Sequence, residues 1–185
     1  MALTRLGLNQ SINLATNTTG TLAVANGGTG LSSGFINGTT NVGKILQVVQ
    51  KHYSNEQSTT GQSFVTTNLT QAITPSATSS KVLVLISARV NAYKDSGNSA
   101  VAHFAIYRDS TNVFNTGSVQ THNISASHSS DGLGMRTMMP FNYLDSPSTT
   151  SSITYDFRML AQSGSTAYAH QNSHPSIMLL LEVAA

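Results

Sequence analysis

Apolar and polar residues alternate in short runs from residue 44 onward, and clusters of Gly, Pro, Asn, Asp and Ser separate the runs. Alternation with a period of two predicts β-strands with one buried face, and the clusters predict turns. The predicted strands cover residues 44–53, 63–75, 80–94, 99–109, 134–147, 151–164 and 176–184. A hairpin is predicted over residues 111–127, with Gly117 near its tip.

Two of these segments depart from simple alternation. In 80–94 one face is continuously apolar, and Leu83 and Leu85 add apolar side chains to the other face, while 176–184 is apolar almost throughout. Both patterns predict strands that are buried on both sides, as in the middle of a sandwich. Pro140 within 134–147 predicts an edge strand or a bulge, because proline cannot donate a hydrogen bond to the sheet.

No segment shows the period of an amphipathic helix. A series of short strands without helices is typical of β-sandwiches. The sequence therefore predicts an all-β domain over residues 44–185, with the architecture of a jelly-roll-like antiparallel β-sandwich.

Residues 1–43 have a different composition, in which Asn, Thr, Gly and Ser dominate and most apolar residues stand singly. Such a segment cannot by itself offset the cost of ordering its backbone, about 1–2 kcal/mol per residue. The isolated apolar residues are nevertheless too frequent for a solvated linker. We therefore expect an extended, irregular arm that is ordered against other chains; a flexible linker is the alternative.

The centre of this arm is the stretch "GTLAVANGGTG", residues 20–30. Its small side chains would allow backbones of several chains to approach closely, and its glycines would allow sharp turns. The residues expected to make docking or inter-chain contacts are Leu22, Val24, Asn26, Gly27, Gly28 and Gly30.

Composition narrows the possible partners and compartments. Charged residues make up 9% of the chain and the formal net charge is +2, with no basic cluster of the kind that nucleic-acid binding needs. The absence of cysteine excludes disulfides and thiolate metal sites. No apolar run has the length of a signal peptide or a membrane span, so we expect synthesis in a cytoplasm and no membrane insertion.

Two blocks of sequence resemble a known family. "GTLAVANGGTG" resembles the "GTLPVANGGTG" stretch of tail-fibre and other virion structural proteins of tailed bacteriophages, with Ala23 in place of the usual proline. "NYLDSPSTTSSITYDFRM", residues 142–159, is similar to the "LDSP-x-TTS-x-x-TY" block in the distal β-domains of such fibres. The closing "SIMLLLEVA", residues 176–184, resembles their last strand.

The resemblance implies a homotrimeric virion protein assembled in the host cytoplasm. In the leading interpretation it is a short tail fibre, whose arm attaches to the tail or baseplate and whose sandwich faces the host. The alternative is a capsid decoration protein, whose arm would hold neighbouring copies of the major capsid protein. The short chain favours the decoration protein, and the glycine motif favours the fibre.

The sequence offers little for catalysis, and we expect no enzymatic activity. Glycoside cleavage, as in a depolymerase tailspike, needs two convergent carboxylates. Asp109, Asp131 and Asp145 lie in turn-like contexts that explain them as local hydrogen-bonding residues. The complete set of carboxylates is Glu56, Asp95, Asp109, Asp131, Asp145, Asp156 and Glu182.

The histidines and two loops are the remaining candidates for binding. His122, His128, His170 and His174 leave a metal site open, including one on a three-fold axis, but no carboxylate or cysteine lies near them in sequence, so no metal or cofactor is expected. His103 falls within a predicted strand and is expected to be a hydrogen-bonded structural residue. Two segments combine aromatic, amide and hydroxyl side chains, as glycan-binding loops do. The residues expected to contact a host glycan are Tyr93, Lys94, Tyr168, His170 and His174.

Overall fold

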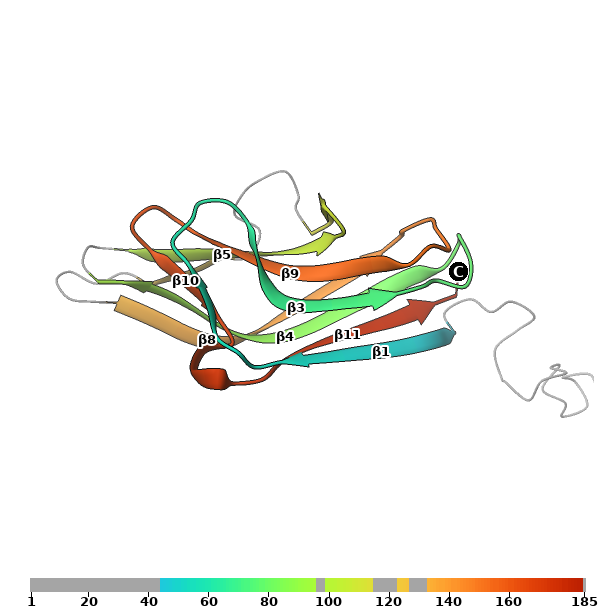
Figure 1. Ribbon diagram of the computed structural model, residues 1–185, viewed down its shortest axis with the longest axis horizontal. Helices are drawn as coiled ribbons and strands as arrows, with labels where there is room; N and C mark the ends of the chain where they lie inside the picture. The colour runs from blue at the N-terminus through green and yellow to red at the C-terminus, as the bar shows by residue number, and fades with distance from the viewer. Residues whose placement is uncertain (1–43, 96–98, 115–122, 127–132, 185) are drawn as a thin grey trace, which may run out of the picture. The chain divides into compact units, whose positions relative to one another are not determined.

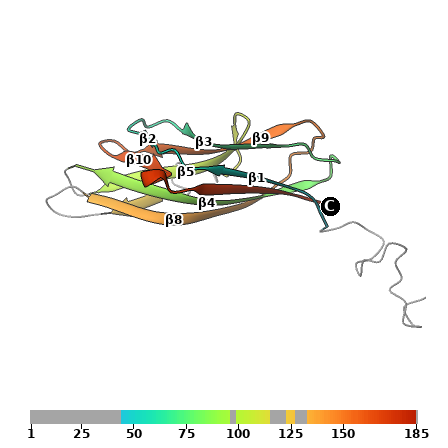
Figure 2. The same cartoon turned by 60° about the horizontal axis from the view of Figure 1, so that its bottom comes forward.

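The computed structural model describes residues 44–95, 99–114, 123–126 and 133–184. Within these residues the chain forms a β-sandwich of two antiparallel sheets, as predicted (Figure 1). Figure 2 shows β3 and β9 in one layer and β4 and β8 in the other. The predicted arm, residues 1–43, lies outside the described residues, and with it Leu22, Val24, Asn26, Gly27, Gly28 and Gly30.

The strands divide between two sheets. Sheet A contains β1 (Ile45–Tyr53), β2 (Gln57–Thr59), β4 (Lys81–Lys94), β8 (Leu133–Asp145), β10 (Thr166–Ala169) and β11 (Ser176–Val183). Sheet B contains β3 (Val65–Ile73), β5 (Ala100–Arg108), β6 (Thr111–Asn112), β7 (Asn123–Ala126) and β9 (Ile153–Ala161). The one helical segment in the described part of the chain is the short 3-10 turn η2 (Gln171–Ser173).

Strand β4 is the centre of sheet A. Its whole length pairs with β8 on one edge, and its other edge pairs first with β11 and then with β10. Strand β1 lies beyond β11, so within the described residues β1 and β8 form opposite edges of the sheet (Figure 1). The prediction from Pro140 is therefore confirmed, since β8 is an edge strand.

Sheet B has the order β3-β9-β5, and two short strands share the remaining edge of β5. Strand β6 pairs with Tyr107 and Arg108, whereas β7 pairs with β5 from Ala100 to His103. The hairpin predicted over residues 111–127 is therefore wrong: β6 and β7 follow one another along β5 and do not pair together. Alternation in a sequence reports a strand but not its partner, because pairing depends on side chains of other strands.

The core lies between the sheets and is centred on three phenylalanines. Phe141 of β8 extends from sheet A and meets Phe104 of β5 and Phe157 of β9 from sheet B. The ring centroids of Phe141 and Phe157 are 4.8 Å apart, and those of Phe104 and Phe157 are 5.6 Å apart in a stacked arrangement. Aromatic rings of this size dominate the burial of apolar area, so this cluster holds the two layers together.

A buried carboxylate joins the layers beside that core. One oxygen of Asp145, at the end of β8, accepts hydrogen bonds from the Tyr155 hydroxyl at 2.7 Å and from the Arg108 guanidinium at 2.6 Å. Its other oxygen accepts from the Ser146 backbone N–H at 2.9 Å. Burial, followed by the bond to Asp145, raises the pKa of Tyr155 well above its ordinary value, so the hydroxyl stays a donor. Asp145 is thus more than the local turn residue that the sequence suggested.

We expect the Asp145 contacts to contribute measurably to stability. Tyr155→Phe removes one hydrogen bond to a charged group and should lower the free energy of unfolding by about 1.5 kcal/mol. Asp145→Ala leaves the Tyr155 hydroxyl and the Arg108 guanidinium without their acceptor and should cost about 3 kcal/mol. Urea denaturation of the purified variants measures both values.

The matched control is Thr150→Ala, an exposed position in the same connection between β8 and β9. Its effect should stay within about 0.5 kcal/mol. Equal losses for Thr150→Ala and Asp145→Ala would contradict the role given to the carboxylate.

Candidate assembly surface

The side of sheet A that faces away from sheet B is apolar across four neighbouring strands. The pairing register places Val48 of β1 beside Leu181 of β11, which lies beside Leu83 of β4 and then Leu144 of β8. In the next row Leu179 and Leu85 lie between Gln50 of β1 and Asn142 of β8. We call this surface the outer face of sheet A; its apolar residues are Ile45, Val48, Leu83, Leu85, Met138, Pro140, Leu144, Ile177, Leu179, Leu181 and Val183.

Several of these side chains are open to solvent. The exposed fraction is 55% for Val48, 50% for Met138 and 48% for Leu144, and the residues of the two central strands are half-exposed. The outward positions of β1, β4, β8 and β11 carry no carboxylate. Of their cations, Lys81 and Arg136 lie toward the two ends of the face, and Arg89 pairs with Met138. An apolar surface of this extent indicates a site of interaction.

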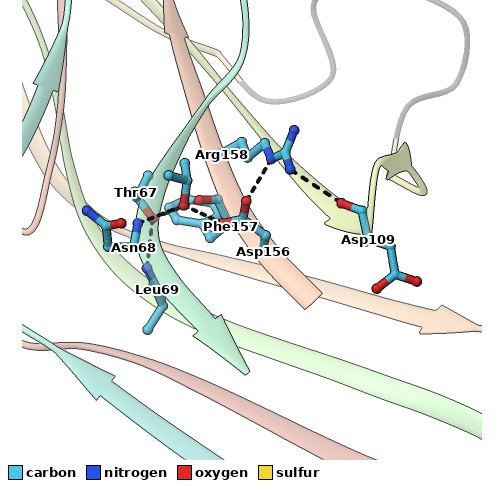
Figure 3. Close-up of polar contacts among 8 residues, drawn as sticks. Thr67, Asn68, Leu69, Asp109, Asp156, Phe157 and Arg158 are labelled. Atoms are coloured by element: carbon cyan, nitrogen blue, oxygen red, sulfur yellow. Dashed lines mark hydrogen bonds and ion pairs between the residues drawn. The ribbon is translucent and has the colours of Figure 1, made fainter. Parts of the chain in front are cut away.

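The outer face of sheet B is polar around Arg158, although Ala105 and Leu160 on the same face are buried. In Figure 3, Arg158 of β9 donates hydrogen bonds to the Asp156 carboxylate and to the Asp109 carbonyl. The Arg158 guanidinium also lies 4.1 Å from the centre of the Tyr107 ring, and the Thr66 hydroxyl donates to Asp156 at 2.7 Å. Such a surface satisfies its charges within the chain and suits contact with water.

The burial predicted for the two apolar strands is therefore correct for one face only. In β11 the inward residues Ser176, Met178, Leu180 and Glu182 are buried, whereas Ile177, Leu179, Leu181 and Val183 are half-exposed on the outer face. Leu83 and Leu85 of β4 also lie on that face and are half-exposed. The prediction of two-sided burial was wrong for this chain because a sandwich has two layers, and no third layer of described residues covers sheet A.

Three of the five predicted glycan contacts lie at one end of sheet A. Tyr93 pairs with Thr166, and Tyr168 pairs with the neighbouring Asn91, so the two tyrosines share the outer face. A hydrogen bond with Asp95 and the charge of that carboxylate raise the pKa of Tyr93. Lys94 follows directly and lines a small polar hollow with Ser99, Gln162, Ser163 and Ser165.

The other two predicted contacts are histidines with different surroundings. His174 is exposed beside η2. His170 is fully buried, so its side chain does not reach a surface where a glycan could bind. Its Nε2 lies 3.0 Å from the Thr67 carbonyl of β3, and its Nδ1 lies 2.7 Å from the Ser176 hydroxyl of β11. His170 therefore bridges sheet B to sheet A, with the Tyr53 ring packed against its edge.

These partners fix the protonation of His170. The Thr67 carbonyl can only accept, so Nε2 carries the hydrogen, and Nδ1 accepts from the Ser176 hydroxyl. Burial lowers the pKa of His170, although the bond to the Thr67 carbonyl acts in the opposite direction. Burial also lowers the pKa of His103, whose Nδ1 has no hydrogen-bond partner within the described residues. The structural position predicted for His103 holds, but that nitrogen is unpaired.

Carboxylates among the described residues accept hydrogen bonds that connect separate segments of the chain. Glu182 is buried and accepts from the Ser76 N–H and hydroxyl at 2.7 and 2.6 Å, and Glu56 accepts from the Asn172 N–H at 2.8 Å. Asp109 accepts from the Thr154 N–H at 3.0 Å. No two of these groups share a hydrogen-bonding partner. Asp131 lies outside the described residues.

The described residues contain no group of three His, Asp or Glu side chains that could hold a metal ion. His122 and His128 lie outside them. None of the helical turns described is long and apolar enough to cross a membrane.

No protein-family model matches the chain, and no curated protein matches it. Among solved structures, VP2 of infectious bursal disease virus in a subviral particle is similar with a TM-score of 0.33 and 18% identity, over 75% of this chain and 38% of that chain. The viral particle of the same virus gives 0.33 and 16%, over 75% and 36%. A structure of its Gx strain gives 0.29 and 17%, over 76% and 39%. The chain spans less than two fifths of the length of these structures.

The buried histidines make stability depend on pH with a definite sign. Because their pKa values are lowered in the folded state, the unfolded chain binds more protons than the folded chain once the pH falls below the ordinary value of 6.5. The free energy of unfolding should therefore decrease between about pH 7.5 and about pH 5.5. Urea denaturation at both pH values measures the change.

The matched pair of variants is His170→Asn and His174→Asn. Asparagine tolerates the left-handed conformation that His170 adopts at a φ of 56°. His170→Asn should make the pH dependence weaker, and His174→Asn, at an exposed position, should leave it as in the parent chain. A parent chain that becomes more stable as the pH falls across this range would refute the assignment.

Proposed function

We propose that the chain is a non-enzymatic structural subunit of a bacteriophage particle, located in the virion after assembly in the host cytoplasm. The observation that carries this proposal is the apolar outer face of sheet A, because a protein that acted alone in solution would present polar side chains there. The resemblance of "GTLAVANGGTG" and of "LDSPSTTSSITY", residues 144–155, to phage virion proteins supports the kind of particle.

The sandwich is proposed to be a jelly roll. Four strands of sheet A follow the order β1-β11-β4-β8, and sheet B follows β3-β9-β5 with β7 on the far side of β5. Along the chain, β1, β3, β4 and β5 alternate between the sheets, and so do β8, β9 and β11. This crossing between two sheets of four is what supports a jelly roll over a pair of simple meanders.

The subunit is proposed to act as a homotrimeric short tail fibre that attaches through residues 1–43. Support comes from the two ends of β4, whose 14 residues span about 45 Å. Lys44, where the chain enters the sandwich, accepts a hydrogen bond from the Ala184 N–H next to the first end. Tyr93 and Lys94 lie at the second end, so attachment and a host glycan would be at opposite ends of the domain.

The second candidate is a capsid decoration protein, in which residues 1–43 would hold neighbouring copies of the major capsid protein. The observation in its favour is that the described residues form a sandwich and contain no fibre shaft. The two candidates share every structural feature described above and differ in position on the particle.

The absence of enzymatic activity is part of the proposal. It is supported by the separate structural roles of Glu56, Asp109, Asp145, Asp156 and Glu182, each of which accepts hydrogen bonds from other groups of this chain. A depolymerase tailspike would release fragments from the host polysaccharide when the purified protein is added. We expect no release.

Copy number in purified particles tests the position. Quantitative detection of the chain against the major capsid protein should give tens of copies per particle for a tail fibre, and hundreds for a decoration protein. A chain that is absent from washed particles would refute both candidates.

Deletion of residues 1–43 tests the mode of attachment. The shortened chain, residues 44–185, should be made but should not join particles, because the segment proposed to dock is gone. Detection in particles that also carry the full-length chain as an internal standard gives the ratio. Incorporation of both chains at equal levels would contradict attachment through this segment.

A further inference from the structure

We propose that the outer face of sheet A is the contact between copies of this chain, with the outer face of a second copy as its occupant. This inference rests on the proposed assembly of the chain with copies of itself and names a surface that joins copies in pairs. The proposed function places inter-chain contacts in residues 1–43; this surface belongs to the sandwich and is separate from them.

The outer face of sheet A is large enough for a stable contact between two proteins. Four strands about 4.8 Å apart and about eight residues of about 3.4 Å give the face a footprint on the order of 500 Å². The side chains stand out from this plane, so the accessible area that a partner covers is larger. A stable interface of standard size buries about 800 Å² on each partner. The face therefore has the dimensions of one side of a stable protein interface, with Leu85 and Leu179 near its centre.

The residue types on the outer face of sheet A are those of a permanent interface. Permanent interfaces between identical subunits resemble a core cut in half, whereas interfaces between proteins that meet transiently are about as polar as the rest of the surface. On the outer face of sheet A one row is apolar across all four strands, from Val48 to Leu144, and Leu85 and Leu179 extend it at the centre. The polar residues of the next rows are Gln50, His52, Ser87 and Asn142, and the nearest cation, Arg89, pairs with Met138. The apolar centre of this face therefore resembles a permanent interface between identical subunits.

The exposure of this face favours an identical copy, rather than a different protein, as the partner that covers it. Val48, Met138 and Leu144 are each about half exposed in the single chain, and such a surface promotes aggregation unless it is covered soon after folding. Identical copies are present at the place of synthesis in equal amounts. A docking partner elsewhere on a particle is met only at assembly.

The edges of the face are compatible with this arrangement. Strand β8 carries Pro140, which cannot donate a hydrogen bond, so β8 is poorly suited to extending the sheet into a second copy edge to edge. Contact through the flat face is therefore favoured over contact through the edge of β8.

The experiment compares three Lys variants of the full-length chain. Val48→Lys and Met138→Lys place a charge on the face at its two opposite edges, at positions 55% and 50% exposed in the single chain. Val65→Lys is the matched control: it is the same change on an edge strand of sheet B, at a position 40% exposed. Light scattering and sedimentation equilibrium give the mass, and circular dichroism and urea unfolding verify that each variant is folded.

The parent chain and Val65→Lys should have a mass of at least twice 19.5 kDa, because two copies of one face that pack on each other join the chains in pairs. Val48→Lys and Met138→Lys should lose this pairing and have a lower mass than the parent chain, with association weakened about 100-fold for each buried, unpaired charge. Using two variants on different strands guards against local misfolding of one of them.

The outcomes separate this inference from the proposed function. A parent chain that is oligomeric, with folded Val48→Lys and Met138→Lys variants of the same mass, would overturn the inference and leave the particle function standing. A monomeric parent chain would also overturn it. Dissociation of both variants, together with absence of the chain from purified particles, would support this surface and refute the proposed function.

Discussion

The two sheets of this sandwich have more apolar faces than their packing against each other can bury. Each strand has two faces, and a sandwich of two sheets can bury only the two that look at each other. In this chain three faces are apolar: the inner faces of both sheets and the outer face of sheet A. The third has no layer to cover it among the described residues. Strand β11 is the clearest example. Its polar residues Ser176 and Glu182 point inward, whereas all four residues on its outer side are apolar: Ile177, Leu179, Leu181 and Val183.

The polar residues of the interior explain how that arrangement is held. The Ser176 hydroxyl makes two hydrogen bonds: it donates to His170 and accepts from the Arg89 N–H at 3.1 Å. Glu182 is satisfied by Ser76 in the connection that leads into β4. Both polar groups therefore have fixed partners inside, and this fixes the register of β11. A slip of one residue would move them to the outer face and leave the partners unsatisfied.

Much of the fold could be predicted from the sequence, because alternation and turn residues are local signals. The all-β class, the strand positions and the edge character of the strand with Pro140 follow from such signals. The partners of β6 and β7 do not, since pairing is decided at a distance. The block "LDSPSTTSSITY" was noted only as a resemblance, and the hydrogen bond from Tyr155 to Asp145 between the layers could be seen only in the three-dimensional structure.

The candidate site was harder to predict, for the same reason. An uninterrupted apolar run is read as buried, and nothing in the sequence of β11 distinguishes burial within one chain from burial between chains. The useful signal was the distribution of the exceptions: Ser176 and Glu182 share one face, so the other face of the strand is entirely apolar. His170 shows the opposite case, in which a residue from a loop-like, polar stretch is fully buried because its two nitrogens bridge the layers.

The placement of the apolar face also bears on how such a subunit could work. The face runs along the side of sheet A, so covering it leaves both ends of β4 accessible, Lys81 near the entry of the chain and Lys94 at the other end. The outer face of sheet B, with Arg158 over Tyr107, stays in water. Association through the side, rather than through an end, is the arrangement that allows one end of the domain to be held and the other to be presented. That arrangement suits the proposed tail fibre, which would be held at one end and meet the host at the other.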